Sequence, residues 1–248
     1  MLYNILKTFA FIFLFSTSVW AGGNTFNNSY QAAKKWLERD VYRDNRVTIY
    51  CPAAFDNQKN VILPDGFDDT LYPDRARRIE WEHVVPVENF GRLFPEWRAG
   101  ADACTEKGIP HTGRKCVEKV NTAFQYMQSD MYNLYPAIGS VNAARSNYNF
   151  ALLGEDAPAP FGSCPMKIQD GKVEPPAPAR GKIARTYLYM ESAYPRYQMS
   201  DAQRKLMQAW DRQYPVDKAE CLRTRRIEEI QHNENPAVKP ACVAAGLW

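Results

Sequence analysis

The sequence has little excess charge and few histidines, and it lacks two common zinc-binding motifs. Its net charge is only +3 over 248 residues, so the global charge does not by itself indicate a nucleic-acid-binding protein. It contains no CxxC pair and no HExxH motif, and its three histidines, His83, His111 and His232, are scattered. Structural zinc sites and zinc hydrolases are therefore disfavoured.

Internal repeats and strongly biased composition are also missing. Apolar residues make up 45% and charged residues 24% of the chain, which excludes a wholly disordered protein, a collagen and a coiled coil. The length suits one large domain or two small ones, and no composition shift marks a boundary after the N-terminal segment. We therefore expect residues 22–248 to form one domain.

The one long apolar run lies at the N-terminus, in residues 1–21. Lys7 is its only charge, the run Phe9–Phe15 is entirely apolar, and Val19-Trp20-Ala21 resembles a cleavage site. This pattern predicts a secretory signal peptide, with a membrane anchor as the alternative. The run is far shorter than the ~20 residues that a spanning helix needs. We expect an exported protein, periplasmic or secreted, that is not held in a membrane.

All six cysteines lie beyond this segment, so an exported chain would carry them into an oxidising compartment. The even count favours disulfides, although six cysteines allow 15 pairings; the competing interpretation is a zinc site, for which no CxxC pair exists. Proximity in the sequence favours two pairs and leaves a third, which are Cys104–Cys116, Cys221–Cys242 and Cys51–Cys164.

Hydrophobic periodicity and turn residues predict an α+β protein, mostly helical, as a single domain around a small antiparallel sheet. Residues 91–117 are expected to be a long loop, and the proline-rich residues 154–180 a surface excursion. The expected strands are 46–50 and 78–85, and the expected helices are 30–39 (capped by Ser29), 117–130, 136–146, 181–193, 200–213 and 217–231.

The most informative stretch is EWEHVVP, in which Glu82 directly precedes His83 among apolar and β-branched residues. A carboxylate oxygen suits Mg²⁺ or Ca²⁺, and a neutral imidazole can accept a proton near neutral pH. In a regular strand the two side chains would point to opposite faces, so both can serve one site only if the strand ends, twists or bulges there. Pro86 favours an ending. The alternative is a surface glutamate beside a buried histidine.

A second stretch, from Asp130 to Asn147, contains the pattern NLxPAIGxVNxxRSN, and QHNENP follows late in the chain. Together with EWEHVVP, these motifs resemble in content and order the bacterial endonuclease I family. The resemblance extends over most of residues 30–242. It implies an exported nuclease with little sequence specificity, built on a ββα-metal (His-Me finger) core.

The resemblance also implies a role for each matching residue. His83 corresponds to the general base that activates water, and Glu82 and Asn133 correspond to the two protein ligands of a divalent cation. Arg114, in Gly-Arg-Lys-Cys, matches an arginine that holds phosphate, although the loop before it varies in length. Without the resemblance, Arg114 reads as a solvated basic loop residue and Asn133 as a turn or cap residue.

The expected cofactor is Mg²⁺, with Mn²⁺ or Ca²⁺ as alternatives. The expected substrates are double- and single-stranded DNA, with RNA as a further substrate, and the products carry 5′-phosphate ends. The resemblance favours a monomer. The competing hypothesis is a non-catalytic, secreted nucleic-acid-binding protein on a degenerate nuclease scaffold.

Nonspecific cleavage depends on phosphate contacts more than on base contacts. Among the basic residues we expect Arg145 above all, and also Lys115, to bind the nucleic-acid backbone. The cluster Arg223, Arg225 and Arg226 is expected to be a solvated helix face.

Overall fold

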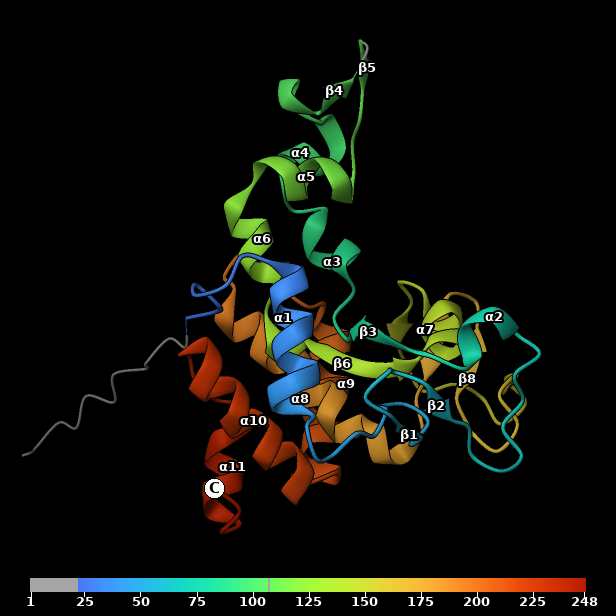
Figure 1. Ribbon diagram of the computed structural model, residues 1–248. Helices are drawn as coiled ribbons and strands as arrows, with labels where there is room; N and C mark the ends of the chain where they lie inside the picture. The colour runs from blue at the N-terminus through green and yellow to red at the C-terminus, as the bar shows by residue number, and fades with distance from the viewer. Residues whose placement is uncertain (1–21, 107) are drawn as a thin grey trace, which may run out of the picture.

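Two strands that lie far apart in the sequence form an antiparallel pair near the middle of the molecule (Figure 1). They are β3 (Ile79–His83) and β6 (Leu134–Ile138), with Ile79 opposite Ile138 and His83 opposite Leu134. Four of the five side chains of β3 and all five of β6 are buried, as expected for a strand pair covered on both faces. The computed structural model describes residues 22–106 and 108–248, so the predicted signal peptide lies outside the described residues.

Helix α7 (Gly139–Arg145) follows β6 directly and packs against both β3 and β6. Gly139 makes this turn possible, because a Cβ atom there would collide with the backbone carbonyl of Arg75. The prediction that a helix starts at Pro136 is wrong, because the helix starts at Gly139. Pro136 lies inside β6 opposite Trp81, at a position of a two-stranded pair where a missing N–H is tolerated.

Helix α1 (Tyr30–Trp36) lies in front of the strand pair in the view of Figure 1. The Ser29 hydroxyl accepts a hydrogen bond from the Ala32 N–H, which confirms the predicted cap. A π-helical turn, Leu37–Val41, continues the helix and buries Leu37 and Val41.

The C-terminal part of the chain supplies most of the helical packing. Helices α8 and α9 lie together, and α10 contacts the π-helical turn after α1. The predicted helices 200–213 and 217–231 are confirmed to within one residue at each end, because Ser200 and Asp217 cap them. The four helices are α8 (Ala177–Ala193), α9 (Asp201–Gln213), α10 (Lys218–Gln231) and α11 (Lys239–Ala244).

Short elements between β3 and β6 form a separate layer, drawn at the top of Figure 1. The single helix predicted over 117–130 is in fact two, because Asn121 is extended and its side chain caps the second. The expected loop 91–117 likewise contains regular structure. The elements are α3 (Val87–Gly91), α4 (Pro95–Ala99), β4 (Thr105–Glu106), β5 (Ile109–Pro110), α5 (Arg114–Val120) and α6 (Thr122–Gln128).

The remaining strands are short and lie beside α2 and α7 at the right of Figure 1. Residues 46–50 do not form the predicted strand; only Val47 makes an isolated bridge, to Ala54. The expected excursion 154–180 contains a hairpin. The elements are β1 (Ala54–Phe55), β2 (Val61–Ile62), α2 (Pro73–Ala76), β7 (Asn149–Phe150), β8 (Lys167–Gln169) and β9 (Lys172–Glu174).

Three disulfides connect these parts, and they are the pairs favoured by the cysteine spacing: Cys51–Cys164, Cys104–Cys116 and Cys221–Cys242. No free cysteine occurs among the described residues. The described part of the chain also has no helix long and apolar enough to cross a membrane. The architecture is therefore a mixed α and β domain with small sheets, cross-linked by three disulfides.

Candidate active site

A cavity of about 940 Å³ opens beside the central strand pair, and it contains the predicted catalytic residues. It is lined by residues of β3, α1, α2, α3, α4 and α7, and by the first residue of α5. Glu82, His83 and Arg114 all line this one cavity. Glu82 and His83 are neighbours that would point to opposite faces of a regular strand, and Arg114 lies 31 residues after His83 in the sequence.

The end of β3 explains how neighbouring residues can face the same cavity. β3 ends at His83, and the Val84 N–H then bonds to the Asn133 carbonyl at 3.1 Å. Arg145 holds this end by donating hydrogen bonds to the carbonyl oxygens of His83 (2.8 Å) and Val84. Glu82 and His83 both line the cavity, and the chain bends directly after them at residues 84–85.

His83 has the geometry of a general base. Its Nε2 lies 2.8 Å from the carbonyl oxygen of Gln128, and the Tyr30 ring covers it at a centroid distance of 5.1 Å. Burial, followed by the positive charge of Arg114, lowers the pKa of His83 from 6.5 to about 3, so the ring is neutral. A carbonyl oxygen can only accept, so Nε2 carries the proton and Nδ1 keeps its lone pair.

Glu82 is held by two donors that both bind Oε1. The Tyr50 hydroxyl donates at 2.7 Å and Arg145 Nη1 donates at 2.5 Å. Burial raises the pKa of Glu82, while the charge of Arg145 opposes the rise. Among the described residues no hydrogen-bond donor reaches Oε2, so this oxygen is available to a ligand in the cavity.

Arg114 lies at the first position of α5 and reaches into the cavity beside His83. Its Nη2 donates to the Gln128 side chain at 3.2 Å, and its guanidinium lies 5.4 Å from the centre of the Tyr30 ring. One hydrogen bond leaves most of its five donors free, so the side chain can bind a phosphate in two places at once.

The structure does not bring Asn133 into this cavity. Its side chain is fully buried and its carboxamide is engaged with the Val85 backbone: Oδ1 accepts from the N–H at 2.7 Å, and Nδ2 donates to the carbonyl at 3.0 Å. Asn133 precedes β6, and there it stabilises the chain just after β3. The expectation that it holds a cation does not fit this geometry.

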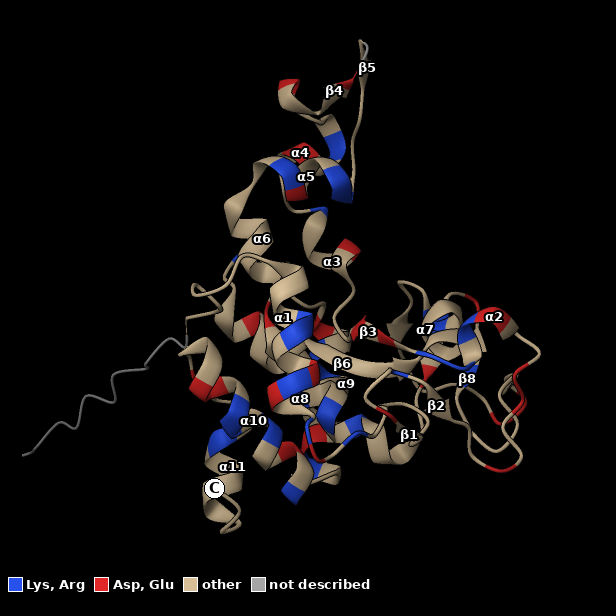
Figure 2. Cartoon of the chain, viewed as in Figure 1, with Lys and Arg blue, Asp and Glu red and all other residues tan. Residues whose placement is uncertain are grey.

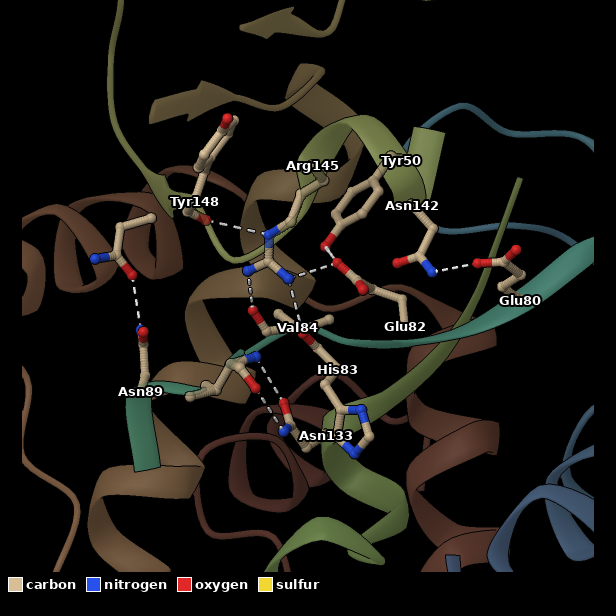
Figure 3. Close-up of polar contacts among 12 residues, drawn as sticks. Tyr50, Glu80, Glu82, His83, Val84, Asn89, Asn133, Asn142, Arg145 and Tyr148 are labelled. Atoms are coloured by element: carbon tan, nitrogen blue, oxygen red, sulfur yellow. Dashed lines mark hydrogen bonds and ion pairs between the residues drawn. The ribbon is translucent and has the colours of Figure 1, made fainter. Parts of the chain in front are cut away.

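Asn142, and not Asn133, is the asparagine that lines the cavity with Glu82. It lies on α7 and lines the cavity, with its carboxamide between Glu80 and Glu82 in Figure 3. The sequence contained a signal for it, because Asn142 belongs to the same motif nine residues after Asn133. The motif alone does not show which asparagine reaches the cavity, because this depends on β6 ending before Asn142.

Arg145 also departs from its predicted role. It is fully buried, and its guanidinium donates to Glu82, to the carbonyls of His83 and Val84, and through Nε to the Tyr148 carbonyl (Figure 3). Arg145 cannot reach a nucleic-acid backbone, because its side chain is buried and its N–H groups are hydrogen-bonded within the protein. Lys115, in contrast, is exposed next to Arg114, and its predicted contact with nucleic acid stays a prediction.

The basic cluster on α10 is likewise not the solvated face that we expected. Arg225 is exposed, but Arg223 and Arg226 are buried. Arg223 donates to the Met131 and Leu134 carbonyls, and Arg226 pairs with Asp44. Both therefore support the fold around β6 and the π-helical turn.

The rim of the cavity is rich in basic side chains. Figure 2 shows lysine and arginine on α1 and α5. The lysines among them have no motif that marks them as binding residues in the sequence. The basic residues that line the cavity are Lys34, Lys35, Lys59, Arg75, Arg78 and Arg114.

The oxygen donors in the cavity suit a hard divalent cation. Within the described residues no three His, Cys, Asp or Glu side chains gather as a metal cluster. Mg²⁺, however, usually takes only one or two protein oxygens and fills its other positions with water and phosphate. Glu82 and Asn142 offer one carboxylate and one carboxamide facing the same space (Figure 3), so the donor set fits this ion.

Comparison with known proteins finds several relatives of this chain. The chain is 41% identical over 221 residues to an extracellular deoxyribonuclease of Aeromonas hydrophila, covering 86% of this chain and 90% of that relative. It is 39% identical to a periplasmic deoxyribonuclease of the same species, covering 86% of each. It is 35% identical over 240 residues to Endonuclease-1 of Buchnera aphidicola, covering 94% of this chain and 89% of that relative. Residues 23–242 match the family Endonuclease I, and the chain therefore belongs to this family.

Proposed function

We propose that this protein is an exported endonuclease that hydrolyses the phosphodiester bonds of DNA with the help of a divalent cation. In this proposal, β3, β6 and α7 form a ββα-metal core. The observation that carries the proposal is the hydrogen bond from His83 Nε2 to the Gln128 carbonyl, because it leaves Nδ1 as a proton acceptor in a cavity beside Glu82 and Arg114.

His83 performs the proton transfer. Its Nδ1 takes a proton from a water molecule as the water oxygen attacks the scissile phosphorus. The bond from phosphorus to the 3′ oxygen then breaks, and the departing oxygen takes a proton from a solvent water molecule, so the products carry a 5′-phosphate and a 3′-hydroxyl. The Gln128 carbonyl keeps the ring in the tautomer that this step requires.

Glu82 and Asn142 are the residues that would hold the cation, with Asn142 in place of Asn133. Mg²⁺ is the proposed ion, and Mn²⁺ or Ca²⁺ could take the same oxygen donors. When bound, such a cation supplies Lewis-acid stabilisation of the negative charge that develops on the phosphate oxygens. A neutral asparagine as the second ligand leaves more of that positive charge for the substrate.

Arg114 and the basic rim bind the substrate. Arg114 contacts the scissile phosphate, and Lys34, Lys35, Lys59 and Arg78 hold neighbouring phosphates. These contacts read charge and not base sequence, so cleavage with little sequence preference follows, on single- or double-stranded DNA and on RNA.

Export agrees with the sequence and with the relatives. Residues 1–21 have the pattern of a signal peptide, and three disulfides need an oxidising compartment to form. Two relatives are named for extracellular and periplasmic locations. We therefore place this protein outside the cytoplasm.

The test is a plasmid-degradation assay with purified protein, repeated on RNA and over a titration of Mg²⁺, Mn²⁺ and Ca²⁺. We expect EDTA to stop cleavage and His83→Ala to abolish it while the melting temperature stays within a few degrees of wild type. The matched control is His111→Ala, an exposed histidine outside the cavity. Wild-type cleavage by His83→Ala, or binding of DNA without any cleavage by the wild type, would overturn the proposal.

A further inference from the structure

The orientation of the Asn142 side chain is set by a residue outside the proposed cation and base set. Asn142 Nδ2 donates a hydrogen bond to Glu80 Oε2 at 2.6 Å. Glu80 lies two residues before Glu82 on β3, so both carboxylates project from the same face of the strand. Figure 3 shows the Asn142 carboxamide between them.

The two ends of a carboxamide have opposite chemistry. The NH₂ group can only donate and the oxygen can only accept, so only the oxygen can bind a cation. A carboxylate offers acceptors alone, and Glu80 therefore fixes the NH₂ end on its own side. Oδ1 is then turned toward the side of Glu82, where the cation is proposed to bind.

Glu80 is itself fixed in place. Arg75, at the end of helix α2, donates to both of its oxygens: Nε to Oε1 at 2.7 Å, and Nη2 to Oε2. Helix α2 packs against α7, which carries Asn142. The chain Arg75–Glu80–Asn142 thus joins α2, β3 and α7 at the edge of the cavity.

We propose that Glu80 is a positioning residue that presents the Asn142 oxygen to the divalent cation. This inference rests on the proposed function, because it assumes that Glu82 and Asn142 bind a cation. Glu80 contributes through its ability to accept a hydrogen bond from Asn142 and not through its negative charge. Partners that orient metal ligands typically change metal affinity by about 10–100-fold when they are removed.

The test measures Mn²⁺ binding to the full mature protein, without DNA, by electron paramagnetic resonance. Glu80→Leu removes the acceptor and the charge, whereas Glu80→Gln removes the charge and keeps an acceptor oxygen. We expect Glu80→Leu to weaken Mn²⁺ binding by about tenfold or more, and Glu80→Gln to restore affinity to within about threefold of wild type. The matched control is Glu88→Leu, which removes a carboxylate of the same cavity that makes no hydrogen bond to Asn142.

A double-mutant cycle separates positioning from a direct effect on the cation. If Glu80 acts through Asn142, Glu80→Leu should have no further effect on Mn²⁺ affinity in an Asn142→Ala background. An undiminished effect in that background, or equal losses in Glu80→Gln and Glu80→Leu, overturns the positioning role.

Failure of the proposed function gives a different result. If the wild type binds no Mn²⁺, or if Glu82→Gln leaves Mn²⁺ binding unchanged, the cation site is wrong and the role of Glu80 is overturned with it. Thermal melting of each variant shows whether it is folded, and Glu80→Ala replaces Glu80→Leu as the variant without an acceptor if Glu80→Leu does not fold.

Discussion

Arg145 and Glu82 form an ion pair in the interior of the protein, with Nη1 2.5 Å from Oε1 and both side chains almost fully buried. The pair connects the end of α7 to the end of β3, 63 residues away in the sequence. Arg145 also donates hydrogen bonds to the carbonyls of His83 and Val84, at the end of β3. The same contact therefore joins the ends of α7 and β3 and holds the carboxylate that faces the cavity.

Arg145→Leu should lower the free energy of unfolding by about 3–5 kcal/mol, because it leaves the Glu82 charge buried without a partner. Urea unfolding monitored by circular dichroism measures this loss. Arg39→Leu is the control, since Arg39 pairs with Asp40 on the surface and such pairs contribute at most about 1 kcal/mol. A loss below about 1 kcal/mol for Arg145→Leu would show that the buried pair contributes little.

Arg114→Ala should lower kcat by about 10²–10³-fold with little change in melting temperature, because a positioned donor acts on charge that develops in the transition state. Its single side-chain hydrogen bond, to Gln128, contributes little to the fold. The neighbouring, exposed Lys115→Ala should instead raise KM by a few fold and leave kcat unchanged. Steady-state kinetics on a short duplex distinguish the two, and equal kcat losses in both variants would contradict the assignment.

The lowered pKa of His83 predicts a specific loss of stability in acid. The unfolded chain takes up a proton near pH 6.5, whereas the folded protein does so only near pH 3. The contribution of neutral His83 is thus complete above about pH 6.5 and declines as the pH falls toward 3. At pH 5 this one group should cost about 2 kcal/mol of unfolding free energy.

Urea unfolding of metal-free protein at pH 7.5 and pH 5 checks this. His83→Gln has no titrating group at that position, so its stability should fall less between the two pH values, by about the same 2 kcal/mol. Equal pH dependence in the variant and the wild type would mean that His83 is protonated normally in the folded protein.

Much of the secondary structure could be predicted from local signals, and the exceptions have local causes. Helices α9 and α10 begin after caps, Ser200 and Asp217, that are visible in the sequence. Pro136 does not distinguish the two structures, because proline is favoured in the first turn of a helix and is also tolerated in an edge strand such as β6. The break at Asn121 depends on a side-chain cap that replaces helical hydrogen bonds.

Part of the candidate site could also be predicted from local sequence motifs. Glu82, His83 and Arg114 stand in motifs, and all three line one cavity. Asn133 and Asn142 share a motif, and only the position of β6 decides which one reaches the cavity. Arg145 was expected to bind the nucleic-acid backbone, but its buried partner Glu82 lies in a distant segment that no local pattern connects to it.

The disulfides should stabilise the fold in the order of the loops that they close. Cys51–Cys164 spans 113 residues and Cys104–Cys116 spans 12, so chain entropy predicts that replacing the first pair by alanines costs about 2 kcal/mol more than replacing the second. Thermal and urea unfolding of the two double variants measure the difference. The shorter bridge, Cys104–Cys116, holds the start of α5 beside Arg114. Its removal should therefore lower kcat, although it lowers the free energy of unfolding less than removal of Cys51–Cys164 does. Equal stability losses in the two variants, or unchanged melting of the wild type in strong reductant, would rule out this ranking.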